Sequence, residues 1–107
     1  MKAIETAQNI VEKFGTADVF VIAEKSNVKI VYESWFPVTV GEFDKKTKTI
    51  CINRRALEIE KFSERKIIAH ELGHFFAAEF DLDRQTEEAF AEPFAVELMK
   101  QNNCNEG

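Results

Sequence analysis

The strongest constraint on the fold is a segment between Ser63 and Phe80 that has the pattern of one helix with an apolar face. Ser63 is a typical N-cap residue for it. The residues at the spacing of a buried face are Ile68, Leu72, Phe75 and Phe76. Within this helix, residues 70–74 read His-Glu-Leu-Gly-His. Because the two imidazoles are four residues apart, they lie one turn apart on the same face and can reach one metal ion.

A histidine pair with an intervening Glu is the pattern of a catalytic zinc site. His70 and His74 are the predicted zinc ligands, and Glu71 is the predicted general base that takes a proton from the catalytic water. A third protein ligand is needed, and the chain has only 2 His, so this ligand is a carboxylate or a Cys. Gly73 weakens the helix and can permit the close approach of another segment.

A second helical stretch, about Arg84 to Lys100, offers the carboxylates. Its repeating apolar positions begin at Glu88 and continue through Ala91, Phe94, Ala95 and Leu98. This stripe predicts that Glu88 lies on the inward face and is the third ligand, whereas Glu87 and Glu97 point elsewhere. Glu92 and Glu87 remain alternative ligands, and a Glu in a first helical turn can simply complement the helix dipole.

Other residues offer weaker alternatives. Cys51, on a predicted strand, is a rival zinc ligand. A Cys ligand would make the protein a metal hydrolase of the deformylase-like kind. A Cys in a strand, however, more often serves only in packing. Tyr32 could stabilise an oxyanion but is better explained by packing. The Trp35-Phe36 pair is either a substrate subsite or core. Cys104 lies in a polar tail, residues 100–107, which could fold into the cleft and cap the metal.

The rest of the chain predicts an α+β domain. Residues 2–14 have the pattern of an amphipathic N-terminal helix that ends at Gly15. In residues 18–25 the β-branched side chains favour a strand, whereas Asp18 as N-cap and the final Ala-Glu-Lys favour a short helix, which we expect. Strands are expected at 28–32, 37–44 and 47–53, the last two as a hairpin. Pro93 is expected to interrupt the last helix.

Length and composition limit the class of protein. A chain of 107 residues has room for one domain, residues 1–107. Its net charge of -5 argues against nucleic-acid binding, since neutralising phosphates needs a basic face. No apolar run is long enough for a membrane helix or a signal peptide, and 2 Cys do not make a disulfide framework. We therefore expect a cytoplasmic domain that does not associate with membranes.

Beyond these patterns, the chain resembles the ImmA/IrrE family of zinc peptidases. The resemblance rests on His70-Glu-Leu-Gly-His74 after Ile68-Ala69, and on Glu88-x-x-Ala91-x-x-Phe94-Ala95 followed by Leu98-Met99. Upstream segments also resemble the family: Ile22–Lys25, Val28–Tyr32, Gly41–Asp44 and Ile50–Asn53. The chain departs from the family pattern at two positions. Family members often have Asn at the position of Glu92 and Pro at the position of Lys100.

The resemblance implies a small zincin-like domain of the gluzincin type. A three-stranded, mainly antiparallel sheet would pack on the His-Glu-x-x-His helix, with an N-terminal backing helix and a C-terminal helix that carries the ligand Glu88. The 38–44/47–53 hairpin would supply an edge strand that binds an extended peptide. The expected function is that of a Zn2+-dependent endopeptidase acting on a peptide or protein substrate. The alternative is a zinc-binding domain that is either latent, for example blocked by its tail, or inactive, and that acts through a protein partner. The oligomeric state stays open.

Overall fold

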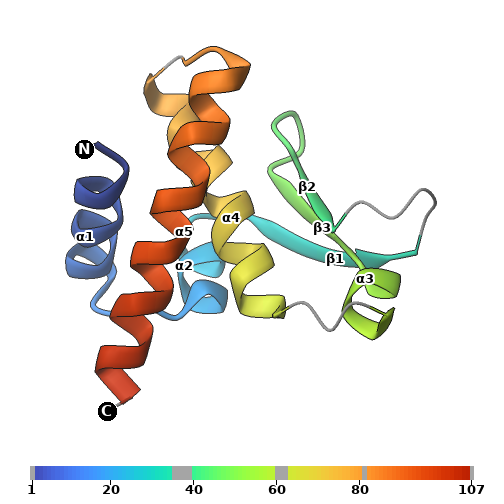
Figure 1. Cartoon of the computed structure of the whole chain (residues 1–107), viewed down its shortest axis with the longest axis horizontal. Helices are drawn as coiled ribbons and strands as arrows, with labels where there is room; N and C mark the ends of the chain where they lie inside the picture. The colour runs from blue at the N-terminus through green and yellow to red at the C-terminus, as the bar shows by residue number, and fades with distance from the viewer. Residues whose placement is uncertain (1, 35–39, 60–62, 81, 107) are drawn as a thin grey trace.

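Helix α4 (Glu64–Ala77) lies at the centre of the fold, between a small sheet and helix α5 (Arg84–Glu106) (Figure 1). The structure is a computed structural model and describes residues 2–34, 40–59, 63–80 and 82–106. The Ser63 side chain caps α4 by accepting a hydrogen bond of 3.3 Å from the Lys66 N–H. A short 3-10 turn, η1 (Ala78–Phe80), follows the helix. The predicted helix between Ser63 and Phe80 is therefore confirmed.

The buried residues of α4 point to more than one side, as expected for a helix enclosed by other elements. They are Ile67, Ile68, Ala69, Glu71, Leu72, Gly73, Phe76 and Ala77. On one side α4 packs against strands β2 (Gly41–Asp44) and β3 (Thr49–Asn53). On the other sides it packs against α5 and the short helix α2 (Val19–Lys25). The predicted N-cap of α2 is confirmed, since the Asp18 side chain accepts a hydrogen bond of 2.9 Å from the Phe20 N–H.

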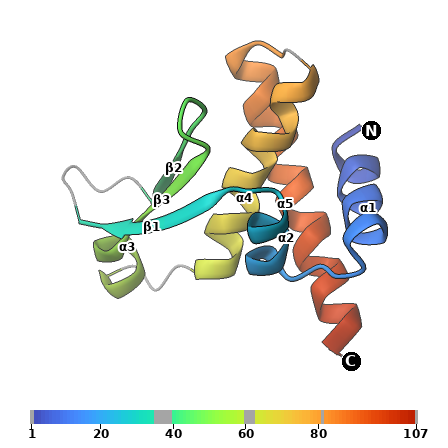
Figure 2. The ribbon, with the colours of Figure 1, turned by 180° about the vertical axis from the view of Figure 1, so that it is seen from behind.

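Helix α5 runs back along α4 and separates it from the N-terminal helix α1 (Lys2–Phe14) (Figure 2). Its buried apolar side chains are Phe90, Ala91, Phe94, Ala95 and Leu98. Helix α1 covers α5 from outside with Ala3, Ala7 and Ile10. The expected backing helix at residues 2–14 is thus observed. No described helix combines the length and apolar character needed to cross a membrane.

The expected end of the last helix near Lys100 is wrong, because α5 continues to Glu106. Pro93 lies inside this helix and does not end it. Proline removes one backbone hydrogen bond, but the neighbouring Phe90 and Phe94 are held in the core on both sides of it. Gln101 extends the helix further by donating a hydrogen bond of 2.7 Å to Glu97 one turn earlier. The polar stretch 101–106 is therefore the last part of α5, and it does not turn back as a separate tail.

The sheet contains β1 (Lys29–Glu33), β2 and β3 in the order β1-β3-β2. The predicted β2–β3 hairpin is confirmed, and its turn comprises residues 45–48. The expected mainly antiparallel sheet is wrong, because β1 pairs with β3 in parallel and only β2 pairs antiparallel. Alternation of polar and apolar residues decides which face of a strand is buried, and it does not decide strand direction. A short helix, α3 (Arg54–Ile59), follows β3.

One face of the sheet packs on α4, and β2 forms its outer edge above that helix. Ile50 and Ile52 of β3 are completely buried on this face. Cys51 lies between them in the strand, so its side chain points to the opposite face. The fold thus places three elements side by side, namely the edge strand β2, the motif helix α4 and the carboxylate-bearing helix α5.

Candidate metal centre

Helix α4 presents His70 and His74 on one face, with ring centroids 5.2 Å apart. Both side chains are partly buried, with exposed fractions of 26% for His70 and 13% for His74. The Nε2 atoms of the two rings point toward the carboxylate of Glu88, which comes from α5. The predicted pair of ligands on one helical turn is therefore present as expected.

Glu88 reaches the histidines because α4 and α5 are unusually close at Gly73. A Cβ atom on Gly73 would lie 2.7 Å from the Cα of Ala91 and 3.0 Å from its carbonyl oxygen, which leaves no room for a side chain. Glu88 precedes Ala91 by one helical turn. Its carboxylate oxygens lie 3.1 Å from His74 Nε2 and 3.6 Å from His70 Nε2. The close approach anticipated at Gly73 is thus confirmed, and it brings the predicted third ligand into place.

The donor atoms of His70, His74 and Glu88 fit a single metal ion. One ligand atom from each residue lies within 4.8 Å of the others. Two atoms bound tetrahedrally to one zinc ion at about 2.0–2.1 Å are roughly 3.3 Å apart. The observed separations of 3.1 Å and 3.6 Å bracket this value. The predicted ligand set therefore has the chemistry and the spacing to hold a metal ion.

The packing reason for choosing Glu88 is wrong, although the residue is at the site. Its side chain is 58% exposed, so it does not share the buried face of Ala91, Phe94 and Leu98. It lies at the open side of the helix pair, where it can turn toward both imidazoles. A charged group that is not fully buried keeps part of its hydration, which lowers the cost of placing it there.

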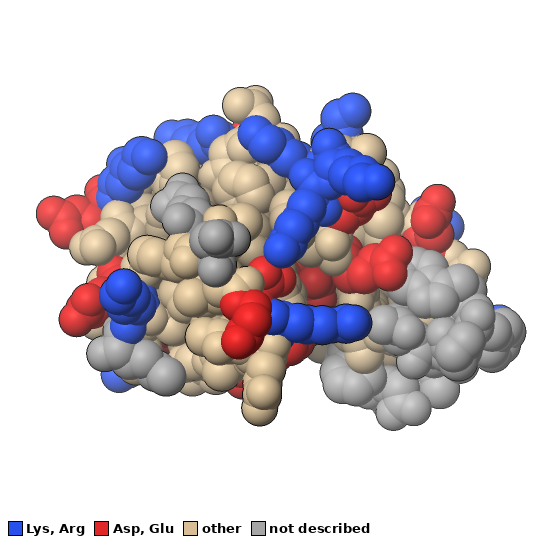
Figure 3. All heavy atoms as spheres, turned by 90° about the horizontal axis from the view of Figure 1, so that it is seen from above, with Lys and Arg blue, Asp and Glu red and all other residues tan. Residues whose placement is uncertain are grey.

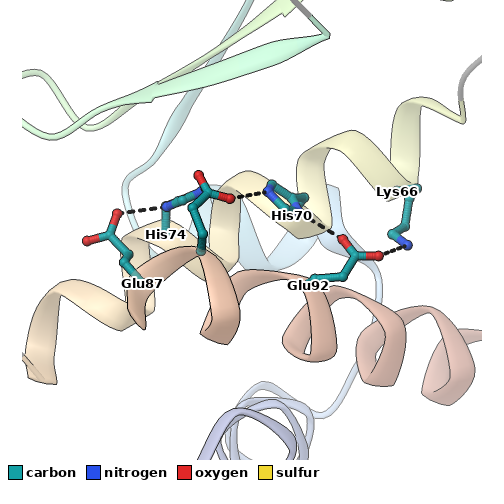
Figure 4. A network of polar contacts seen from close by, with 6 residues as sticks. Lys66, His70, His74, Glu87 and Glu92 are labelled. Atoms are coloured by element: carbon teal, nitrogen blue, oxygen red, sulfur yellow. Dashed lines mark hydrogen bonds and ion pairs between the residues drawn. The ribbon is translucent and has the colours of Figure 1, made fainter. Parts of the chain in front are cut away.

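Glu87 and Glu92, the alternative ligands, lie behind the imidazoles instead. Glu87 is 2.7 Å from His74 Nδ1, and Glu92 is 3.1 Å from His70 Nδ1 (Figure 4). The expectation that Glu87 points away from the site is therefore wrong. A carboxylate that accepts a hydrogen bond from the Nδ1–H leaves the Nε2 lone pair free for a metal. This arrangement directs both Nε2 atoms to the same point as Glu88.

Each of these two carboxylates is also paired with a lysine. Lys45 donates to Glu87 at 2.9 Å, and Lys66 donates to Glu92 at 3.0 Å. Burial raises the pKa of Glu87, but the hydrogen bonds from Lys45 and His74 outweigh it and lower the pKa overall. The hydrogen bond from Lys66 likewise lowers the pKa of Glu92. Both carboxylates are therefore ionised acceptors for the imidazole N–H groups.

Glu71 lies beside the candidate ligands but is buried, with an exposed fraction of 7%. Its pKa is raised to about 7, mainly by burial; the His70 ring opposes the rise, and the Glu88 and Glu42 carboxylates contribute to it. Its Oε2 lies 3.7 Å from the position that a Cβ on Gly41 would occupy, so β2 passes close above it. A carboxyl group with a pKa near 7 is suited to accept and return a proton.

A cleft of about 780 Å³ opens over these residues. Gly41, Glu42 and Phe43 of strand β2, with Val40 just before it, form one wall, while α4 and α5 form the floor and the other wall. The glutamates that line it are Glu42, Glu71, Glu87, Glu88 and Glu92, and the lining basic residues are Lys66 and Arg84. On the face viewed from above in Figure 3, acidic side chains gather in the middle with basic ones around them. Such a field attracts a cation.

The remaining candidates do not join the site. Cys51 is on the far face of the sheet and is absent from the described ligand group, so the deformylase-like alternative is not supported. Tyr32 donates a hydrogen bond to Glu64 at the start of α4 and does not line the cleft, in agreement with a packing role. The Trp35-Phe36 pair lies outside the described residues. The backbone around Cys104 is helical, which argues against a tail that caps the metal.

Sequence reasoning missed Lys45, Lys66 and Arg84. Arg84 precedes Glu88 by four residues, and this helical spacing could have pointed to a shared face. Lys66 precedes His70 by the same spacing. Lys45 is distant in sequence from its partner Glu87, and nothing in its local pattern links the two.

No model of a known protein family matches the chain, and a comparison with curated proteins also found no match.

Proposed function

We propose that this protein is a zinc-dependent endopeptidase. The observation that carries the proposal is that the Nε2 atoms of His70 and His74 face one carboxylate, that of Glu88, at the floor of an open cleft. The buried carboxyl of Glu71 stands beside them. Three protein ligands of this kind leave one coordination position for water or substrate, as in catalytic zinc sites.

His70, His74 and Glu88 would hold the zinc ion, which when bound polarises a carbonyl group and lowers the pKa of water toward about 7. Glu71 would accept the proton of the attacking water and pass it to the nitrogen of the leaving amine. Glu87 and Glu92 would keep the two imidazoles oriented throughout. Water is consumed, the peptide C–N bond breaks, and no other reactant is required.

Strand β2 supports a peptide as the substrate. It is an edge strand of the sheet and lines the cleft from Gly41 to Phe43. An extended peptide can add to such an edge through backbone hydrogen bonds. A peptide placed beside β2 would run over Glu71 and the histidines, which brings a scissile bond to the groups that act on it.

The test combines metal analysis with cleavage of an unfolded protein, such as denatured casein, and of a fluorescence-quenched peptide library. The parent protein should bind about one zinc per chain and cleave, and Glu71→Gln should retain zinc but lose cleavage. Glu88→Ala should lose most of its zinc. Gln85→Ala, a change at an exposed position of α5, is the matched control and should behave as the parent.

The possible results separate the alternatives. Absence of zinc in the reconstituted parent would disprove the metal site. A parent that binds zinc with Glu88-dependent affinity but cleaves nothing would replace the peptidase by a zinc-binding domain that acts through a protein partner. Cleavage by Glu71→Gln at the parental rate would remove Glu71 from the mechanism.

A further inference from the structure

The two imidazoles have similar partners, but their surroundings differ. Behind His74, the Glu87 side chain is only 11% exposed and lies 2.7 Å from Nδ1. Behind His70, the Glu92 side chain is 56% exposed and lies 3.1 Å from Nδ1. A charge-assisted hydrogen bond is stronger where water does not compete for it. The contact between Glu87 and His74 should therefore restrain its ring much more than the contact between Glu92 and His70.

The contact at His74 also joins three separate elements. His74 belongs to α4, Glu87 to α5, and Lys45 to the β2–β3 turn. The contact at His70 joins only α4 and α5, because Lys66 and His70 are on the same helix. Figure 4 shows the carboxylates of Glu87 and Glu92 directed from α5 to the two rings. Only the His74 contact therefore connects a metal ligand to the hairpin that forms the wall of the cleft.

We propose that Glu87 is the positioning residue of His74 and that Lys45 holds it there, so that metal affinity depends on the position of the β2–β3 hairpin. This inference rests on the proposed metal site. Glu87 accepts a hydrogen bond from the Nδ1–H of His74, which fixes the ring angle and leaves Nε2 free. Lys45 holds the second oxygen of the same carboxylate at 2.9 Å.

The coupling works in both directions because binding free energies are reciprocal. If Lys45 improves zinc affinity by fixing Glu87, then zinc must strengthen the contact of the hairpin with α5 to the same extent. The hairpin carries Gly41–Phe43 of the cleft wall. Loading the metal thus fixes the edge that would receive a peptide.

The first experiment measures zinc affinity by competition with a chromogenic chelator for the parent, Glu87→Gln and Glu92→Gln. Gln has the same shape as Glu but no charge, so the substitution removes the strong acceptor with little change in packing. Loss of an orienting partner typically costs 10–100-fold in metal affinity. We expect a loss of this size for Glu87→Gln and roughly fivefold or less for the exposed Glu92. The Co2+-substituted Glu87→Gln protein should also have a shifted d–d absorption spectrum, which a change in stability alone would not produce.

The second experiment uses Lys45, whose side chain is 58% exposed and can be replaced without disturbing the core. Lys45→Ala should weaken zinc binding roughly two- to fivefold, and Lys45→Arg should restore it. Lys46→Ala, on the same turn, is the matched control. Zinc should slow amide hydrogen exchange across residues 41–52 in the parent, and should slow it less in Lys45→Ala.

These experiments distinguish a failure of the positioning role of Glu87 from a failure of the proposed zinc site. A parent that binds no zinc overturns the proposed metal site and this inference together. A parent that binds zinc while Glu87→Gln has the parental affinity and Co2+ spectrum overturns only the positioning role. If Glu87→Gln does not fold, Lys45→Ala decides. Equal exchange protection of the hairpin by zinc in the parent and in Lys45→Ala would then overturn the coupling.

Discussion

Gly73 of α4 packs directly against Ala91 of α5, and a Cβ on Gly73 would lie 2.7 Å from the Cα of Ala91. This contact is backbone to backbone, so no flexible side chain can move out of the way. It determines how near Glu88, one turn before Ala91, comes to the two histidines. The glycine in the middle of the motif is therefore a requirement of helix packing and of ligand placement together.

Gly73→Ala should destabilise the protein, although Ala favours helices by about 1 kcal/mol. Inserting a methyl group into a well-packed contact typically costs about 1–3 kcal/mol, and the backbone atoms of Ala91 cannot move aside, so we expect a cost above this gain. Separation of the two helices should also move Glu88 away from His74 and weaken zinc binding. Urea unfolding and chelator competition measure the two effects, with Gln85→Ala as the control. A variant as stable as the parent with unchanged zinc affinity would contradict the close-packing argument.

Removing the metal should lower the thermal stability of the parent. A ligand at a free concentration 100 times its Kd stabilises the folded state by about 2.7 kcal/mol, which corresponds to roughly 10 °C in Tm for a chain of this size. Differential scanning calorimetry with and without zinc measures the shift. Glu88→Ala should show a much smaller shift under the same conditions. An equal shift in both proteins would mean that zinc binds elsewhere.

Tyr32 offers a spectroscopic test of the fold, because it is the only tyrosine of the chain. Burial, together with the hydrogen bond to Glu64, raises its pKa to about 12. The folded state thus holds the phenol proton more tightly than the unfolded chain, whose value is about 10. This contribution to stability is complete below about pH 10 and is lost as the pH rises through about 12.

The measurement is an absorbance titration near 295 nm, a wavelength at which phenolate absorbs. Little ionisation is expected at pH 11 in the native protein, and a midpoint near 10 is expected in denaturant. Glu64→Gln should bring the native midpoint down, since it removes the neighbouring negative charge. A native midpoint near 10 would show that the contact between Tyr32 and Glu64 does not hold in solution.

Cys51→Ser should retain full zinc content, because Cys51 is on the sheet face opposite to α4. Burial, with help from the carboxylates of Glu33, Glu42 and Asp44, raises the pKa of its thiol. The thiol should therefore react slowly with iodoacetamide at neutral pH in a Cys104→Ser background. Zinc that protects Cys51 from this reagent, or a loss of zinc in Cys51→Ser, would restore Cys51 as a ligand candidate.

The sequence predicts the elements that depend on local pattern. The spacing of His70 and His74, the caps Asp18 and Ser63 and the alternation in β3 each report on neighbours along the chain, and each is found as predicted. Glu88 is also found at the site, but not for the predicted reason. Helical periodicity predicts a buried side chain at this position, whereas the side chain of Glu88 is largely exposed.

What could not be predicted depends on how the elements meet. The side of α5 that carries Glu87 faces His74 only because α4 and α5 cross at Gly73, and periodicity within one helix contains no information on that crossing. The pairing of Lys45 with Glu87 requires the hairpin turn to lie beside α5. The parallel pairing of β1 with β3 likewise depends on the path of the chain between the two strands. The alternation of polar and apolar residues in a strand does not specify that path.

The three proposed ligands all lie between residues 70 and 88, on two helices that are consecutive in the chain. Contacts between near neighbours in sequence form early in folding, and the β2–β3 hairpin is more local still. We therefore expect the helix pair and the hairpin each to form early. The step that completes the cleft would then be the docking of the hairpin on α4, where β2 packs against that helix.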